Sequence, residues 1–385
     1  MPTPAYETQW SLLLAACSPI RGPEQLERIC RLLQKPERWP ALLDCADRHG
    51  VTFLLWQALS ELGEMLPDRE IQRLEQRYRT NVHKSLFFAR ELIRIFDSLD
   101  ALALDVMPYK GVVLAESVYG DMALRQSGDI DLLIRVRDLP RIREAVQDLG
   151  YTPHFPLSPR EEEAYLRSGY EYTFDGPAGR NLLELQWALQ PRFYAVDMDM
   201  DSLFQRAVRV TIAGRSMKTL SAEDLMIVLS LHAAKHAWGR LIWLCDIARI
   251  MSQPNLNWDW IKKQASALGI ARILNVTLLL ANRLLGASIP ATVDAMSGDD
   301  PATLTIAEEI GARTENGAAF DVESVSYFRL MLRLRERSAD QMRFMSRLVF
   351  TPGPSEWKAV RLPPALFPLY RVVRLSRLAA RVARA

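Results

Sequence analysis

The sequence contains few cysteines and no long apolar run, and each absence excludes a class of protein. Its 385 residues include only four cysteines, which fit no Cys-x-x-Cys pattern and lie at positions 17, 30, 45 and 245. We therefore expect reduced, mostly buried thiols in a cytoplasmic protein. The apolar stretch from Trp10 to Cys17 is too short for a signal peptide, and no run reaches the length of a transmembrane helix. The chain also lacks internal repeats and low-complexity segments.

The chain as a whole also lacks a large excess of either charge, because its net charge is only +2. Its C-terminal end, however, is strongly basic. Between Arg329 and Ala385 there are thirteen Lys or Arg and three acids, so this segment carries +10 and the remainder −8. Arginines that alternate with apolar residues, as between Arg371 and Arg381, are typical of an amphipathic basic helix. Such a helix could contact an anionic membrane surface or an acidic partner.

The alternative is that these arginines pair with the acidic remainder of the protein. Nucleic-acid binding is not favoured, because few aromatic residues lie among the arginines and the whole chain is near neutral. Five prolines between Pro352 and Pro368 predict an extended segment that wraps over the body of the protein.

Hydrophobic periodicity divides the chain into four segments. Residues 1–104 have helical spacing, residues 105–220 change to short strands with helices between them, residues 221–295 are helical again, and residues 296–385 form the basic, proline-interrupted tail. With 49% hydrophobic and 24% charged residues the composition is that of a globular protein. The fold class that we expect is α+β, a small mixed β-sheet with large helical N- and C-terminal regions.

Short strands and turns are predicted within residues 105–220. Pro108 indicates that the first strand lies at an edge or a strand end, and a helix is expected over Gly111–Tyr119. Asp138 is expected to cap the next helix, and Ser158 with Glu161 has the pattern of a capping box. Strands are predicted over 106–109, 129–136, 170–175 and 182–189, with a hairpin of 208–213 and 216–220.

Three carboxylates lie at strand positions of this region. Asp129 and Asp131 begin an apolar run, and residues two apart on a strand point to the same side. Two adjacent acids repel each other unless a cation lies between them, although both could instead be solvated. Glu184 lies inside a second apolar run, where an unpaired carboxylate is costly to bury. If the two strands pair, the three acids gather around one or two ions, and oxygen ligands suit Mg²⁺ or Mn²⁺ rather than zinc.

The combination of motifs resembles the polymerase-beta-like nucleotidyltransferase superfamily and, more narrowly, a bacterial family of largely uncharacterised nucleotidyltransferases. The resemblance covers roughly residues 25–375 and is carried by Lys110-Gly111, Arg125, Asp129-Ile130-Asp131, Glu184, and His232 with His236. The wider superfamily has Gly-Ser where this chain has Lys110-Gly111. The family usually has His at the position of Gln186, so one potential ligand or base is missing.

The resemblance implies a nucleotidyltransferase core and a role for each matching residue. Asp129 and Asp131 would hold the metal ion on the triphosphate, and Glu184 would complete the set or act as the catalytic base. The NTP would contact Lys110, Gly111, Arg125, Lys235 and His236.

The residues alone leave alternatives open for the NTP-binding group. Lys110 could be exposed at an ordinary tight turn, and Arg125 could pair with Asp129. His232 and His236 lie one helical turn apart and could be buried, hydrogen-bonded histidines. A dedicated zinc site is not favoured, because the His-x-x-x-His pattern lacks the Glu of a metalloprotease.

The implied activity is a Mg²⁺-dependent transfer of a nucleoside monophosphate from an NTP to an acceptor hydroxyl, with release of pyrophosphate. The sequence does not choose among a sugar, a small metabolite, a peptide and a protein as the acceptor. The alternative, which Gln186 favours, is a catalytically inactive protein that uses the same fold to bind a nucleotide or a partner.

Overall fold

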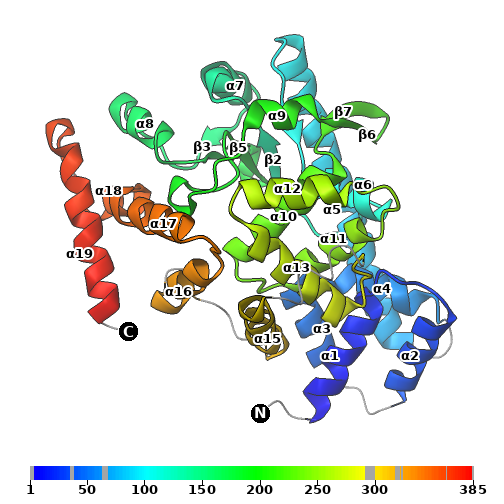
Figure 1. Cartoon of the computed structure of the whole chain (residues 1–385). Coiled ribbons are helices and arrows are strands. Elements are labelled where there is room, and N and C mark those ends of the chain that lie inside the picture. The colour runs from blue at the N-terminus through cyan, green and yellow to red at the C-terminus, as the bar shows by residue number, and fades with distance from the viewer. Residues whose placement is uncertain are drawn as a thin grey trace.

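The computed structural model describes residues 4–34, 39–62, 68–290, 300–316, 321, 324–360 and 362–383. Most of these residues are helical, and they surround a five-stranded mixed sheet and a separate two-stranded sheet (Figure 1). The architecture is therefore α+β, as the sequence predicts. No helix of the described residues combines the length and the apolarity that crossing a bilayer requires.

The N-terminal part of the protein is helical, as predicted. Gly50 adopts a left-handed φ of +72° directly after the third helix ends. The longest helix of this part runs without a break from Asp68 to Ala101. The five helices are α1 (Pro4–Cys17), α2 (Pro23–Leu33), α3 (Trp39–His49), α4 (Thr52–Ser60) and α5 (Asp68–Ala101).

The central sheet has the strand order β1-β2-β5-β4-β3. Only β2 and β5 run parallel, and the other pairs are antiparallel. Pro108 lies in β1 at the edge of the sheet, as expected for a residue without an amide hydrogen. The strands are β1 (Met107–Pro108), β2 (Asp129–Leu133), β3 (Thr152–Pro153), β4 (Glu171–Asp175) and β5 (Leu182–Gln186).

Helices and a hairpin complete the central region. The helix predicted over Gly111–Tyr119 is α6, and the predicted hairpin forms its own sheet from β6 (Val208–Ile212) and β7 (Arg215–Thr219), with β7 beside β1. The predicted capping box is present, because the Ser158 amide donates to Glu161 Oε2 at 2.9 Å. The other helices here are α7 (Leu139–Asp148), α8 (Pro159–Leu166) and α9 (Met200–Gln205).

Three local predictions in this region are wrong. The strand predicted over 182–189 is shorter, because β5 ends at Gln186. β2 ends at Leu133, three residues early, because the chain turns into a short 3-10 helix at Val136–Asp138. Asp138 stands at the N-cap position of α7 but makes no side-chain cap hydrogen bond. Its φ of −90° and ψ of −10° continue the preceding turn, whereas a capping side chain needs the extended backbone that places it over the first amides.

The C-terminal part is helical, and here the prolines overturn a prediction. Pro354 begins α18 and Pro364 begins a 3-10 helix (Pro364–Leu369), so the segment is not extended. Proline is tolerated in the first turn of a helix because the amide that it lacks would have no partner there. The helices are α10 (Ala222–Lys235), α11 (Leu241–Met251), α12 (Trp258–Ala267), α13 (Ala271–Leu285), α15 (Pro301–Glu315), α16 (Val325–Arg333), α17 (Ser338–Phe350), α18 (Pro354–Ala359) and α19 (Tyr370–Ala383).

Two hydrophobic cores hold these elements together. One joins α1–α4 to α10–α13 and to α15–α17, so helices from both ends of the chain pack on each other. The other lies between α5, α7 and one face of the sheet. Of the boundaries expected between the four segments, the one after residue 104 lies just before β1 and the one after residue 220 lies just before α10. The limit at 295/296 lies outside the described residues.

Several basic residues of the C-terminal segment pair with carboxylates of the rest of the protein. This pairing was one of the two alternatives for the segment, the other being contact with a membrane surface or an acidic partner. Arg347 contacts Asp197 at 2.7 Å, and Arg333 contacts Glu309 at 2.7 Å. The amphipathic helix expected between Arg371 and Arg381 is α19, which lies at the side of the molecule opposite α1–α4 (Figure 1).

Candidate active site

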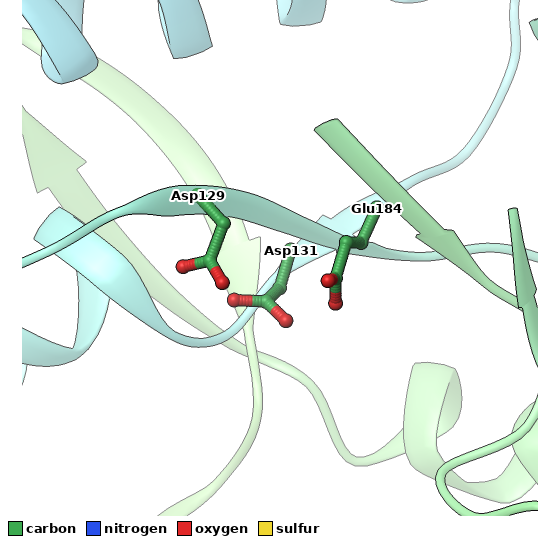
Figure 2. Close-up of side chains that lie close together, drawn as sticks. All are labelled: Asp129, Asp131 and Glu184. Atoms are coloured by element: carbon green, nitrogen blue, oxygen red, sulfur yellow. The ribbon is translucent and has the colours of Figure 1, made fainter. Parts of the chain in front are cut away.

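The two central strands bring the three predicted carboxylates together. Asp131 pairs in register with Glu184 across the parallel strands β2 and β5, and Asp129 lies two residues earlier on β2. Figure 2 shows the three side chains directed to the same side of these strands. One oxygen from each carboxylate lies within 4.8 Å of the others. This is the one group of three or more potential metal ligands found within the described residues.

The alternation of the two strands explains this arrangement. Ile130, Leu132, Leu183 and Leu185 are 5% exposed or less and face the core under the sheet. Since side chains alternate along a strand, the acids between these residues must face the other side. The parallel register then places Asp131 beside Glu184.

Asp131 is the most buried of the three acids, at 2% exposure. Its Oδ1 accepts from Lys110 Nζ at 2.9 Å and from Gln186 Nε2 at 3.1 Å. Its Oδ2 is buried and has no hydrogen-bond partner among the described residues. An unpaired buried oxygen costs about 1–3 kcal/mol, more when charged, and a cation bound between the carboxylates would remove this cost.

The electrostatics of the site also favour a cation. Burial, followed by the charges of Asp131 and Glu171, raises the pKa of Glu184 to about 8. Burial and the charge of Asp131 also raise the pKa of Asp129. Without a metal ion the site therefore holds a proton on Glu184 at neutral pH, because like charges this close cannot all be ionised cheaply.

Lys110 and Gly111 form the turn from β1 into α6. The Lys110 side chain is 13% exposed and binds Asp131, so it is not an exposed lysine at an ordinary turn. Burial opposes its charge, but Asp131 and Tyr109 together outweigh burial and raise the pKa of Lys110. Gly111 has a φ of +59°, and a Cβ there would lie 3.6 Å from Ser127 Oγ. That hydroxyl is buried and lacks a hydrogen-bond partner among the described residues.

The Gln186 side chain connects the acids. Its Nε2 donates to Glu184 Oε2 at 2.9 Å, to Asp131 Oδ1 at 3.1 Å and to Glu171 Oε2 at 3.3 Å. Its Oε1 accepts from the Tyr109 hydroxyl at 2.6 Å, which orients the amide. No local pattern in the sequence points to Glu171 or Tyr109, and only the register of β4 against β5 reveals that Glu171 lies opposite Gln186.

Arg125 does not hydrogen-bond to Asp129, so that alternative is wrong. Its Nε donates to both oxygens of Asp246 on α11, at 3.0 and 3.1 Å. The Tyr119 hydroxyl donates to the same carboxylate at 2.7 Å. Arg125 and Asp246 are 8% and 0% exposed, so the pair is buried. The charge of Arg125 opposes the rise in the pKa of Asp129, so the pair holds the guanidinium near that acid.

The two histidines lie at the C-terminal end of α10 beside the site. Their rings are 4.9 Å apart, and both pack against the Trp243 ring. Burial, followed by neighbouring positive charges, lowers the pKa of His236 to about 4 and lowers the pKa of His232 well below its ordinary value. Both rings are therefore neutral at neutral pH, and neither belongs to the metal-ligand group.

Lys235, from the same end of α10, reaches toward the acids from another side. Its Nζ donates to the Tyr170 hydroxyl at 2.8 Å. Burial lowers the pKa of Lys235, and the charges of Glu171 and Glu184 oppose this shift. The structure therefore places Lys110, Arg125 and Lys235 around one acidic centre.

The fold and the site define the class of this protein, an α+β protein with an acidic centre that could hold a divalent metal ion. The model of a family described as uncharacterised nucleotidyltransferase matches residues 35–286. The chain belongs to this family of uncharacterised nucleotidyltransferases. No curated protein and no solved structure matches it.

Proposed function

We propose that this protein is a metal-dependent nucleotidyltransferase of the polymerase-beta-like superfamily. It would transfer a nucleoside monophosphate from an NTP to an acceptor hydroxyl and release pyrophosphate. The observation that carries the proposal is the group of Asp129, Asp131 and Glu184, with its buried, unpartnered oxygen on Asp131. Membership of the nucleotidyltransferase family supports it.

Asp129, Asp131 and Glu184 would hold the metal ion. Oxygen donors alone suit Mg²⁺ or Mn²⁺, and the Asp131 Oδ2 provides a donor that no described residue satisfies. When bound, the metal ion would neutralise the triphosphate and stabilise the leaving pyrophosphate.

The N-terminus of α6 would bind the triphosphate. Unpaired amides at a helix N-terminus favour phosphate, and Gly111 presents no side chain that would block the approach. The Ser127 hydroxyl, which has no partner among the described residues, supplies a donor beside Gly111. Lys110 adds a positive charge at the same turn.

The same NTP would be contacted from the other sides of the acidic centre by Arg125, Lys235 and His236. Asp246 holds Arg125 through its Nε, and the fork of a guanidinium is suited to phosphate oxygens. Lys235 lies close enough to Glu171 and Glu184 for their charges to influence its pKa. His236 is neutral and would act as a hydrogen-bonding group.

Glu184 is the acid best suited to take the proton of the acceptor hydroxyl. Burial and the neighbouring carboxylates raise its pKa in the metal-free protein, and a carboxylate in such surroundings accepts a proton more readily than an exposed one. As the acceptor oxygen forms its bond to the α-phosphorus, the bond from that phosphorus to the bridging oxygen breaks and pyrophosphate leaves. The hydroxyl proton passes to Glu184.

The experiment that tests the proposal follows pyrophosphate release from each of the four NTPs with Mg²⁺ or Mn²⁺ in wild type and Asp131→Asn. We expect metal-dependent release in wild type and a loss of at least about hundredfold in Asp131→Asn, because a metal ligand is removed. Asp148→Asn, at an exposed carboxylate, is the matched control. Equal release in wild type and Asp131→Asn would contradict the proposal.

The alternative function is a catalytically inactive protein that binds a nucleotide or a partner at the same site. Gln186 favours it, because its amide ties Asp131, Glu184 and Glu171 to one another. Metal-dependent NTP binding that Asp131→Asn abolishes, without release of pyrophosphate from any NTP, would support this alternative over the enzyme.

A further inference from the structure

A cavity lies between the beginning of β4 and the C-terminal helices. It has a volume of about 320 Å³ and is lined by residues of α8, α10, α18 and α19. Small-molecule sites in proteins have volumes of about 300–1,000 Å³. The cavity is therefore large enough for a small substrate.

The charges that line this cavity favour an anion. Its described lining includes four basic residues, Lys235, Arg374, Arg377 and Arg381, and one carboxylate, Glu356. Arg374 Nη1 contacts Glu356 at 3.2 Å, and Arg377 Nε lies 3.7 Å from the same carboxylate. The described lining therefore contains more basic side chains than carboxylates.

The rest of the lining is rich in aromatic rings. Phe193 and Tyr194 stack with their ring centroids 4.5 Å apart, and Tyr165, Tyr170 and Phe328 complete this part of the wall. Aromatic walls bind flat or apolar groups through their large contact area. A ligand that matches both features would combine an anionic group with a ring.

The cavity adjoins the acidic centre on the side of Glu184. Lys235 and Tyr170, which hydrogen-bond to each other at 2.8 Å, both line the cavity. Burial, then the charges of Glu171 and Glu184, raises the pKa of Tyr170, so these carboxylates are close neighbours. Tyr165 also lines the cavity and donates to the backbone carbonyl of Glu171 at 2.8 Å.

We propose that this cavity binds the acceptor, a small molecule that carries a phosphate or carboxylate group and a ring. This inference rests on the proposed function, because an acceptor hydroxyl must come within reach of Glu184. In the proposed arrangement the arginines of α19 bind the anionic group and the aromatic wall holds the ring. The acceptor hydroxyl then points toward the acidic centre, while the NTP occupies the side of Gly111.

The probe for this site is phenyl phosphate, which carries both features and no acceptor hydroxyl. Saturation-transfer NMR detects its binding at millimolar concentration, and phenol and inorganic phosphate test each feature alone. We expect phenyl phosphate to bind more tightly than either. The double variant Arg377→Gln/Arg381→Gln should weaken its binding at least tenfold, whereas Arg209→Gln, at an exposed arginine of β6, should leave it unchanged.

Two further measurements separate this inference from the proposed function. Mg²⁺·ATP should not displace phenyl phosphate from wild type, and Asp131→Asn should bind phenyl phosphate normally although it has lost metal-dependent NTP binding. Phe193→Ala, which leaves all the basic residues in place, should also weaken phenyl phosphate binding. Three results would each overturn the inference: no binding to wild type, equal binding to the double variant, or displacement by Mg²⁺·ATP.

Discussion

Replacing Glu184 with Gln should stabilise the metal-free protein at alkaline pH, although it removes a proposed metal ligand. The pKa of Glu184 rises from its ordinary 4.5 to about 8 in the folded protein. The folded state therefore holds a proton that the unfolded state has already released. This contribution to stability is fully present below the unfolded pKa and is lost as the pH rises through the folded pKa.

The magnitude follows from the two pKa values. Each pKa unit corresponds to about 1.4 kcal/mol, so the change from 4.5 to about 8 corresponds to at most about 5 kcal/mol. The measured value should be smaller, about 2–3 kcal/mol, because Glu184 is half-buried and water screens part of the repulsion. Gln has the same shape and no charge, so Glu184→Gln should not lose this stability.

Urea unfolding with EDTA present measures the effect. The free energy of unfolding of Glu184→Gln should exceed that of wild type at about pH 9, and the difference should shrink toward about pH 6. When an excess of Mn²⁺ replaces the EDTA, the ion should stabilise wild type more than the variant, which keeps only two of the three carboxylates. Glu144→Gln, at an exposed glutamate of α7, is the control. A difference that is the same at both pH values would refute this account of the acidic centre.

Three other substitutions test individual contacts by urea unfolding. Gln186→Leu should cost about 1–3 kcal/mol, because the Tyr109 hydroxyl and the carboxylates lose the amide that joins them; an unchanged stability would show that this network contributes nothing. Gly111→Ala should lower the free energy of unfolding by about 1–2 kcal/mol, because an alanine is strained at a φ of +59°. It should also weaken NTP binding by crowding the phosphate site, and full NTP affinity would argue against that site. Arg125→Met should lower the free energy of unfolding by about 3–5 kcal/mol, because Asp246 then lacks its partner in the core. The added change Asp246→Asn should recover part of this loss, and no recovery would contradict the pairing.

The sequence predicts the general fold and the acidic centre because both depend on local pattern. Asp129 and Asp131 alternate with apolar residues on one strand, and Glu184 alternates with Leu183 and Leu185 on another. Alternation alone determines which face each side chain takes. The helix at Gly111–Tyr119 likewise follows from the turn that precedes it.

Contacts that depend on tertiary packing could not be predicted in this way. Arg125 and Asp246 are separated by 121 residues, and no local pattern links them. The contact of Glu171 with Gln186 follows from strand register, which the sequence does not specify. The error at Pro354 has a different cause, since proline fits both an extended segment and the first turn of a helix.

The most direct test of the central claim is the anomalous scattering of Mn²⁺ in crystals grown with a non-hydrolysable NTP analogue. We predict a Mn²⁺ peak at about 2.0–2.3 Å from oxygens of Asp129 and Asp131, next to Glu184 and to the triphosphate at the N-terminus of α6. A nucleotide bound elsewhere, or Mn²⁺ absent from these carboxylates while the analogue is bound, would contradict the proposed metal site and the activity derived from it.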